Sequence, residues 1–185
     1  LILMTIALIS VAGFSQIIRE KREIKSFPVD ALTQINIENK YGTVHISNWS
    51  KDSIRVEISM TVKSKTEEKA TEIINNVEFY TLNSEHFIDI KTIFISTKGP
   101  IMKDIEEALM NFGNGVRIDY KVFIPNNCNL SVENRYGDIF CDNLSGNINL
   151  NISYGNLQSY KLSGNPKIEI KYGKAFVNEL KNASI

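Results

Sequence analysis

The dipeptide Tyr-Gly recurs at a fixed interval through the C-terminal part of the chain. It stands at Tyr136-Gly137, Tyr154-Gly155 and Tyr172-Gly173, so the step from the first copy to the second equals the step from the second to the third. The register also holds between the copies, where Leu144, Leu162 and Leu180 align. A short repeat with alternating apolar residues and glycine-bearing corners is typical of one coil of a β-solenoid. The sequence therefore predicts an all-β fold, a parallel β-solenoid with coils of about 18 residues.

Within one coil, alternate residues of a strand point to the same side. We therefore expect Leu150, Ile152 and Tyr154 to share one face. Gly155 is expected to turn the chain at positive φ, where a Cβ would be costly. Leu157 and Ser159 would then face inward on the next strand, and stacking of the coils about 4.8 Å apart would place like residues in ladders.

The expected column of tyrosines has two interpretations. It could be a stripe on which a sugar or a peptide stacks, or it could be corner packing with the phenol hydroxyls at the water's edge. Corner packing is the simpler interpretation, because backbone geometry alone explains the adjacent glycines.

An earlier copy of the unit stands at Tyr41-Gly42 and is separated from the later coils by inserted sequence, about residues 61–115. This insertion predicts an amphipathic helix that Thr66 caps, with Ala70, Ile73, Ile74 and Val77 on one side. A hairpin over 78–95, a second helix over 101–112 and a strand over 116–124 are expected to follow. The first helix would cover an apolar flank or an open end of the stack, either to hide strand edges or to bind a partner.

Residues 1–15 differ from the rest of the chain. The apolar run over 1–13 is too short to span a bilayer as a helix, which needs about 20 residues. Gly13 and Ser15 predict cleavage of a signal peptide before Gln16, although the basic n-region is missing. We therefore expect an exported single domain over 16–185, without a stable transmembrane segment. A buried N-terminal strand or helix and an uncleaved anchor are the alternatives.

Charge and cysteine usage exclude several classes of function. The 21 basic and 21 acidic residues balance, which argues against nucleic-acid binding. Cys128 and Cys141 fall at different phases of the repeat, so two free, largely buried thiols are expected rather than a disulfide. His45 and His86 are expected on surface strands. No catalytic, cofactor or metal-binding motif accompanies the repeat, and we expect neither enzyme activity nor a cofactor or metal ion.

Three segments carry a resemblance to a known family: the motif Asn39-Lys40-Tyr41-Gly42-Thr43-Val44, the strand from Tyr120 to Pro125, and the motif from Asn134 to Ile139. Together they resemble the putative-adhesin domain family of Gram-negative bacterial envelope proteins, over about residues 27–182. The resemblance implies a solenoid-like repeat behind a signal peptide and transfers no binding residue. Because the sequence stops partway through a repeat, further coils or a cap are expected beyond Ile185.

Two functions follow as hypotheses. The first is a non-catalytic β-solenoid of the periplasm or cell surface of a Gram-negative bacterium, an adhesin-like or scaffold protein. Its partner would be an envelope or surface component, either a protein or a glycan. The second is a periplasmic sensor or accessory domain in envelope signalling. Exposure at the cell surface would favour the first, and strict periplasmic retention would favour the second.

Overall fold

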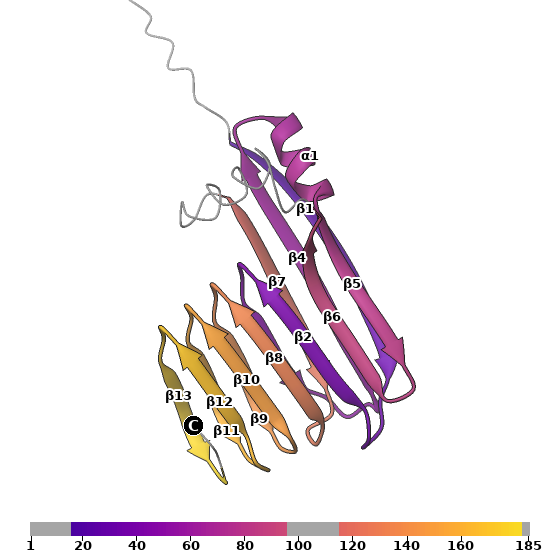
Figure 1. The fold of residues 1–185 in the computed structure, drawn as a ribbon, viewed down its shortest axis with the longest axis vertical. Helices are drawn as coiled ribbons and strands as arrows, with labels where there is room; N and C mark the ends of the chain where they lie inside the picture. Colours follow the sequence, from indigo (N-terminus) through magenta and orange to yellow (C-terminus); the bar gives the residue numbers. More distant parts are fainter. Residues whose placement is uncertain (1–15, 96–114, 183–185) are drawn as a thin grey trace, which may run out of the picture.

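The computed structural model describes residues 16–95 and 115–182, which form thirteen strands and one helix (Figure 1). The predicted signal peptide and the expected helix over 101–112 lie outside the described residues. The elements are β1 (Ile17–Pro28), β2 (Gln34–Lys40), β3 (Val44–Asn48), β4 (Ser53–Ser64), α1 (Glu67–Asn75), β5 (Val77–Ser84), β6 (Phe87–Phe94), β7 (Val116–Ile124), β8 (Asn129–Arg135), β9 (Ile139–Leu144), β10 (Ile148–Ser153), β11 (Leu157–Leu162), β12 (Lys167–Lys171) and β13 (Ala175–Leu180).

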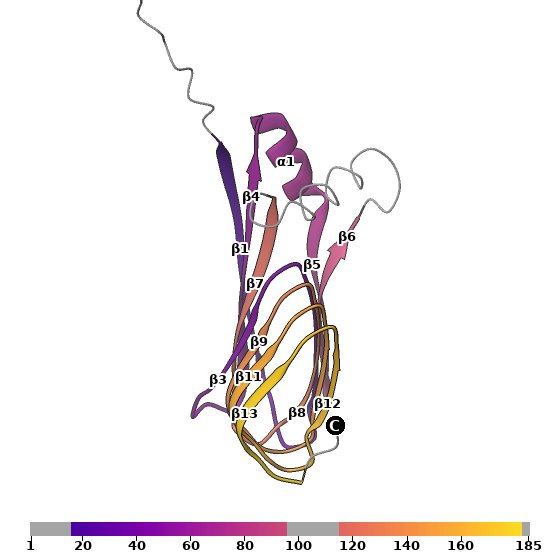
Figure 2. The same cartoon turned by 90° about the vertical axis from the view of Figure 1, so that its left-hand side faces the viewer.

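The strands form two facing sheets, which are mixed and remain open (Figure 2). One has seven strands in the order β1-β4-β7-β3-β9-β11-β13, and the other has six in the order β12-β10-β8-β2-β6-β5. The predicted mostly-β architecture is therefore confirmed. From β8 onward, consecutive strands alternate between the sheets, and each pairs in parallel with the strand two positions later. Partners in these pairs stand one repeat apart in the sequence, as in Leu150 with Ile168 and Leu157 with Ala175.

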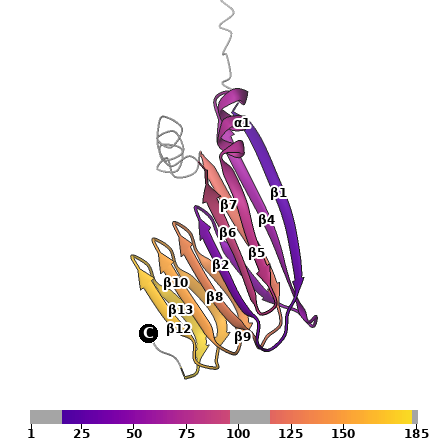
Figure 3. The same cartoon turned by 45° about the vertical axis from the view of Figure 1, so that its right-hand side comes forward.

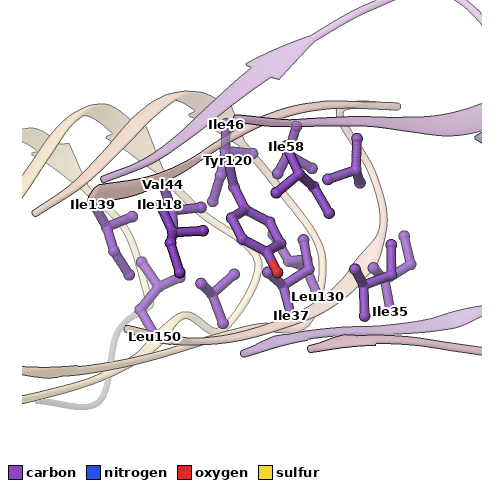
Figure 4. Close-up of a cluster of buried hydrophobic side chains, with 14 of the residues drawn as sticks. Ile35, Ile37, Val44, Ile46, Ile58, Ile118, Tyr120, Leu130, Ile139 and Leu150 are labelled. Carbon is purple, nitrogen blue, oxygen red and sulfur yellow. The ribbon is translucent and has the colours of Figure 1, made fainter. Parts of the chain in front are cut away.

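The core lies between the two sheets because apolar residues occupy alternate positions on nearly every strand. Figure 4 shows side chains from both layers pointing toward one another, among them Ile46 from one sheet and Ile37 from the other. Tyr120 is the largest fully buried side chain, and its hydroxyl lies 2.8 Å from Thr92 Oγ1. This hydrogen bond satisfies a polar group that would otherwise be costly to bury.

The strands at the β1 and β5 edges of the two sheets extend beyond the others, and helix α1 packs against them (Figure 3). Strands β1 and β4 have 12 residues each, whereas the strands from β9 to β13 have 5 or 6. Helix α1 packs on β1, β4 and β5, with Ala70 and Ile73 buried, and Thr66 Oγ1 caps it by accepting from Lys69 N. The ammonium group of Lys21 on β1 donates to the carbonyl oxygen of Val77 at 2.8 Å and so bridges the two sheets.

The corners differ from the prediction in two respects. Gly155 was expected at positive φ, but the positive φ belongs to the tyrosine before it, with Tyr154 at 58°. The same holds at Tyr41, Tyr136 and Tyr172. Because β10 ends at Ser153, Tyr154 also leaves the face of Leu150 and Ile152 and is 49% exposed. The prediction that these three side chains share one face was therefore wrong.

The glycine is required for a different reason, which is close approach between successive corners. A Cβ on Gly155 would lie 2.6 Å from the carbonyl carbon of Gly137, and closer still to its oxygen. Gly137 stands in the same relation to Gly42, and Gly173 to Gly155. Backbone therefore packs directly on backbone at each corner, and any side chain there would force the two strand turns apart.

Polar side chains beside the glycines link one corner to the next. Asp138 Oδ1 accepts from the backbone N–H of Asn156 at 2.7 Å, and Asn156 Oδ1 accepts from that of Lys174 at 3.1 Å. At the first corner, Asp119 Oδ1 accepts from the backbone N–H of Thr43 at 2.8 Å. Each bond satisfies a backbone donor that the turn leaves without a ladder partner.

Replacing Gly155 with alanine is expected to lower the free energy of unfolding by about 1–3 kcal/mol, since the new Cβ meets a backbone carbonyl that cannot rotate away. Thermal or urea unfolding would measure the loss. The outward-facing Ser153→Ala variant in the same corner is the control, with an expected change within about 0.5 kcal/mol. A Gly155→Ala protein as stable as the parent would contradict the close approach.

Candidate binding surface

The structure stacks the four corner tyrosines in one column. The rings of Tyr41 and Tyr136, Tyr136 and Tyr154, and Tyr154 and Tyr172 have centroids 5.3, 5.0 and 4.7 Å apart, with interplanar angles of 10–12°. The edge of Phe94 and the ammonium group of Lys40 cover the Tyr41 end. Inside the column each ring face is therefore covered by the next ring. Among the described residues, the outer face of Tyr172, which is 77% exposed, is the one ring face of the column left open for a ligand to stack on.

Two asparagines at these corners were not singled out from the sequence. Asn39 and Asn134 are 4% and 0% exposed, and they occupy paired positions on β2 and β8. Asn134 Nδ2 donates to the carbonyl oxygens of Gly42 and Asp138, at 3.0 and 3.2 Å. Asn39 Nδ2 donates to that of Ile118 at 3.0 Å. The sequence signal for them was the shared order Asn, basic residue, Tyr, Gly. Both side chains bond backbone carbonyls of neighbouring corners from the inside of the fold.

The outer faces of the two sheets differ in chemistry. Across β2, β8, β10 and β12 the outer face of the six-stranded sheet carries polar and charged side chains in rows. One row contains Glu38, Glu133, Asn151 and Glu169, and its neighbour contains Lys40, Arg135, Ser153 and Lys171. Next to them, Lys91 bonds Asp89 and Glu38 at 3.0 and 3.1 Å, and these hydrogen bonds raise the pKa of the Lys91 ammonium. These rows have the character of a solvated surface, and exposed apolar side chains of this sheet such as Tyr80 and Leu82 lie away from them on β5.

Across β3, β9, β11 and β13 the outer face of the seven-stranded sheet carries aromatic rings instead, whereas its β4 and β7 strands carry ion pairs such as Arg55–Glu57. One row across β3, β9, β11 and β13 contains His45, Phe140, Gln158 and Phe176, as the strand registers show. Beside it lie Asp142, Tyr160 and Asn178. Together these seven side chains line a groove of about 310 Å³, here termed the aromatic groove. Its floor includes Cys141 and Ser159.

The aromatic groove combines open ring surface with free polar groups. The stacked rings of His45 and Phe140 have centroids 4.5 Å apart. The side chains of Tyr160 and Phe176 are 63% and 59% exposed. The side chains of Asp142, Gln158 and Asn178 form no hydrogen bond or ion pair with any described residue. Their donors and acceptors therefore face solvent and are available to a ligand.

Both cysteines are free and buried, as predicted. Burial raises the pKa of the Cys128 thiol to about 12, and burial together with the nearby Asp142 carboxylate raises that of Cys141 further. At neutral pH both thiols stay protonated, so the floor of the aromatic groove has no thiolate nucleophile.

Both histidines are exposed, and the prediction of a surface strand is confirmed for His45 but wrong for His86, which lies in a turn. His45 belongs to the aromatic groove, and His86 lies in the turn between β5 and β6, with its Nδ1 3.5 Å from Asp30 Oδ2. Within residues 16–95 and 115–182, no three His, Cys, Asp or Glu side chains are placed to share a metal ion. In the same ranges no helix has the length and apolar character to cross a membrane.

Comparison with known proteins identifies a solved structure of similar fold. No protein-family model and no curated protein sequence matches the chain. A putative cell adhesion protein from Clostridium sporogenes shares its fold, with a TM-score of 0.50 and 14% identity over 86% of this chain and 72% of that one. This agrees, at the level of fold, with the resemblance to the putative-adhesin domain family.

Two further solved structures align with TM-scores too low to establish a shared fold. One is a putative lipid binding protein from Parabacteroides distasonis, with a TM-score of 0.29 and 13% identity over 86% of this chain and 61% of that one. The other is a putative adhesin from Bacteroides fragilis, with a TM-score of 0.29 and 7% identity over 89% of this chain and 97% of that one.

Substitution of Tyr154 would separate backbone strain from ring stacking. Alanine and glycine both remove the ring, but only alanine keeps a Cβ at positive φ, which costs about 1–2 kcal/mol. We therefore expect Tyr154→Gly to be about 1 kcal/mol more stable than Tyr154→Ala in urea unfolding. At Tyr160, inside β11, the order should reverse, since glycine in a strand costs roughly 0.5–1 kcal/mol relative to alanine. The same order of stability of the glycine and alanine variants at both positions would contradict the corner geometry.

Thiol labelling would test the burial of the cysteines. In native protein at mildly alkaline pH, Cys128 and Cys141 should react with Ellman's reagent far more slowly than in denaturant, because each thiol is buried and protonated. Two equivalents of rapid labelling without denaturant would contradict this burial.

Proposed function

We propose that this chain is a non-catalytic binding domain of an exported bacterial envelope or surface protein, which uses the aromatic groove to hold an adhesin-like contact. The observation that carries the proposal is the contrast between the two outer faces. Exposed aromatic rings are costly to leave in water and are enriched where proteins bind. Here Phe176 and Tyr160 stand beside free polar groups, whereas the facing sheet presents charged rows.

The β-solenoid interpretation supports this proposal. Parallel pairing at the repeat interval and alternation of consecutive strands between two sheets are both features of stacked coils. A stack of this kind holds equivalent side chains in straight rows, which gives an extended, rigid surface suited to binding. The likeness in fold to a putative cell adhesion protein points the same way.

Co-sedimentation with the cell-envelope fraction of the source bacterium tests the proposal. The purified chain should pellet with the envelope, and a Tyr160→Ala/Phe176→Ala variant should bind about tenfold or more weakly, a loss of roughly 1.4 kcal/mol. Tyr80→Ala is the matched control, because Tyr80 is an exposed aromatic on the other sheet. Equal binding by all three proteins, or no binding by the parent, would overturn the proposal.

A further inference from the structure

The geometry points to a linear, uncharged oligosaccharide as the ligand of the aromatic groove. This inference rests on the proposed function and names the class of ligand for the same surface. Four observations carry it: the exposed rings, the free hydrogen-bonding groups, the absence of lysine and arginine from the lining, and the direction of the groove.

Exposed aromatic rings on a rigid sheet suit the flat faces of sugar rings. The C–H groups of a pyranose carry small positive charges and pack on the negative face of an aromatic ring. The exposed Phe176 and the half-buried Phe140, whose ring stacks on His45, stand two strands apart in one row, with Gln158 between them. The row therefore offers ring, amide and ring in succession.

The free polar groups match the hydroxyls of a sugar. Gln158 and Asn178 each present an amide that both donates and accepts, and Asp142 presents a carboxylate that accepts. None of the three has a partner among the described residues, so binding breaks no internal hydrogen bond. A hydroxyl that donates to Asp142 gains a charge-assisted bond, which is stronger than a bond between neutral groups.

Charge in the groove selects against anionic ligands. Among the described residues its lining contains the Asp142 carboxylate and no lysine or arginine, and Lys121 on β7 is the next residue of the row beyond His45. A phosphate, sulfate or uronate group bound beside Asp142, between Phe140 and Phe176, would meet a like charge with no cationic side chain in the described lining, which is unfavourable. A neutral sugar meets no such penalty.

Length and direction fit a chain of sugars rather than a single one. The row from His45 on β3 to Phe176 on β13 crosses three inter-strand spacings, roughly 14 Å at about 4.8 Å each. One sugar in an extended oligosaccharide advances by about the same distance as one strand. An extended peptide fits this row less well, because β9 and β11 beneath it are paired on both sides and only the edge of β13 could accept an added strand.

Titration with purified sugars tests the inference directly. Short cello-, manno- and chito-oligosaccharides are added to the purified chain, with oligogalacturonate as the anionic comparison, and aromatic ¹H–¹³C shifts report binding. We expect saturable shifts with at least one neutral series, little response to oligogalacturonate, and binding weakened about tenfold or more by Phe176→Ala or Gln158→Ala. Tyr80→Ala should bind like the parent. No response to any neutral series, or one unaffected by both groove variants, would overturn the inference.

Treatment of the envelope fraction separates this inference from the proposed function. Periodate cleaves vicinal diols of sugars, whereas a protease removes protein. Binding that is lost after periodate and retained after protease supports a glycan ligand. Binding that is lost after protease alone, yet still depends on Tyr160 and Phe176, would overturn the glycan while leaving the proposed function in place.

Discussion

Contact between successive backbone turns is the constraint on which the rest of this structure depends. At three Tyr-Gly corners the glycine backbone lies against the carbonyl of the preceding corner, and at the first corner Gly42 lies against the carbonyl of Ile118, each at a distance that leaves no room for a Cβ. The tyrosine before it accepts a left-handed conformation, and its ring stacks on the ring of the neighbouring corner. Stacking on both faces offsets part of the strain of positive φ. Corners that meet in this way hold the strands between them in a fixed parallel register.

The fixed register has different consequences between the two sheets and on their outer faces. Inside, it stacks Leu150 on Ile168 and Leu157 on Ile139, so the core is continuous from one pair of strands to the next. Outside, the same rows are free to vary, because no packing partner restricts them. Across β8–β13, the rows on one outer face are charged and those on the other are aromatic. The outer surface is therefore built of rows, and each residue of a row comes from a different strand.

The sequence predicted the features that depend on spacing. The repeat interval implied which residues pair, the phases of Cys128 and Cys141 implied free thiols, and Thr66 identified the start of α1. It did not reveal which residue of Tyr-Gly carries positive φ, because both a left-handed turn and a close approach favour glycine. The aromatic groove was also missed. His45, Phe140, Gln158 and Phe176 share neither identity nor a motif, and only the register brings them together.

Backbone contact at the corners also limits how such a chain can change in length during evolution. Each corner meets its counterpart one repeat away, so the gain or loss of a single residue within β8–β13 would move every later glycine off the carbonyl it contacts. Duplication or deletion of a whole repeat unit preserves every contact. Each unit gained would lengthen both outer faces by one strand spacing, about 4.8 Å. Descendants of this chain would therefore differ in reach by whole steps, while the cross-section stays the same.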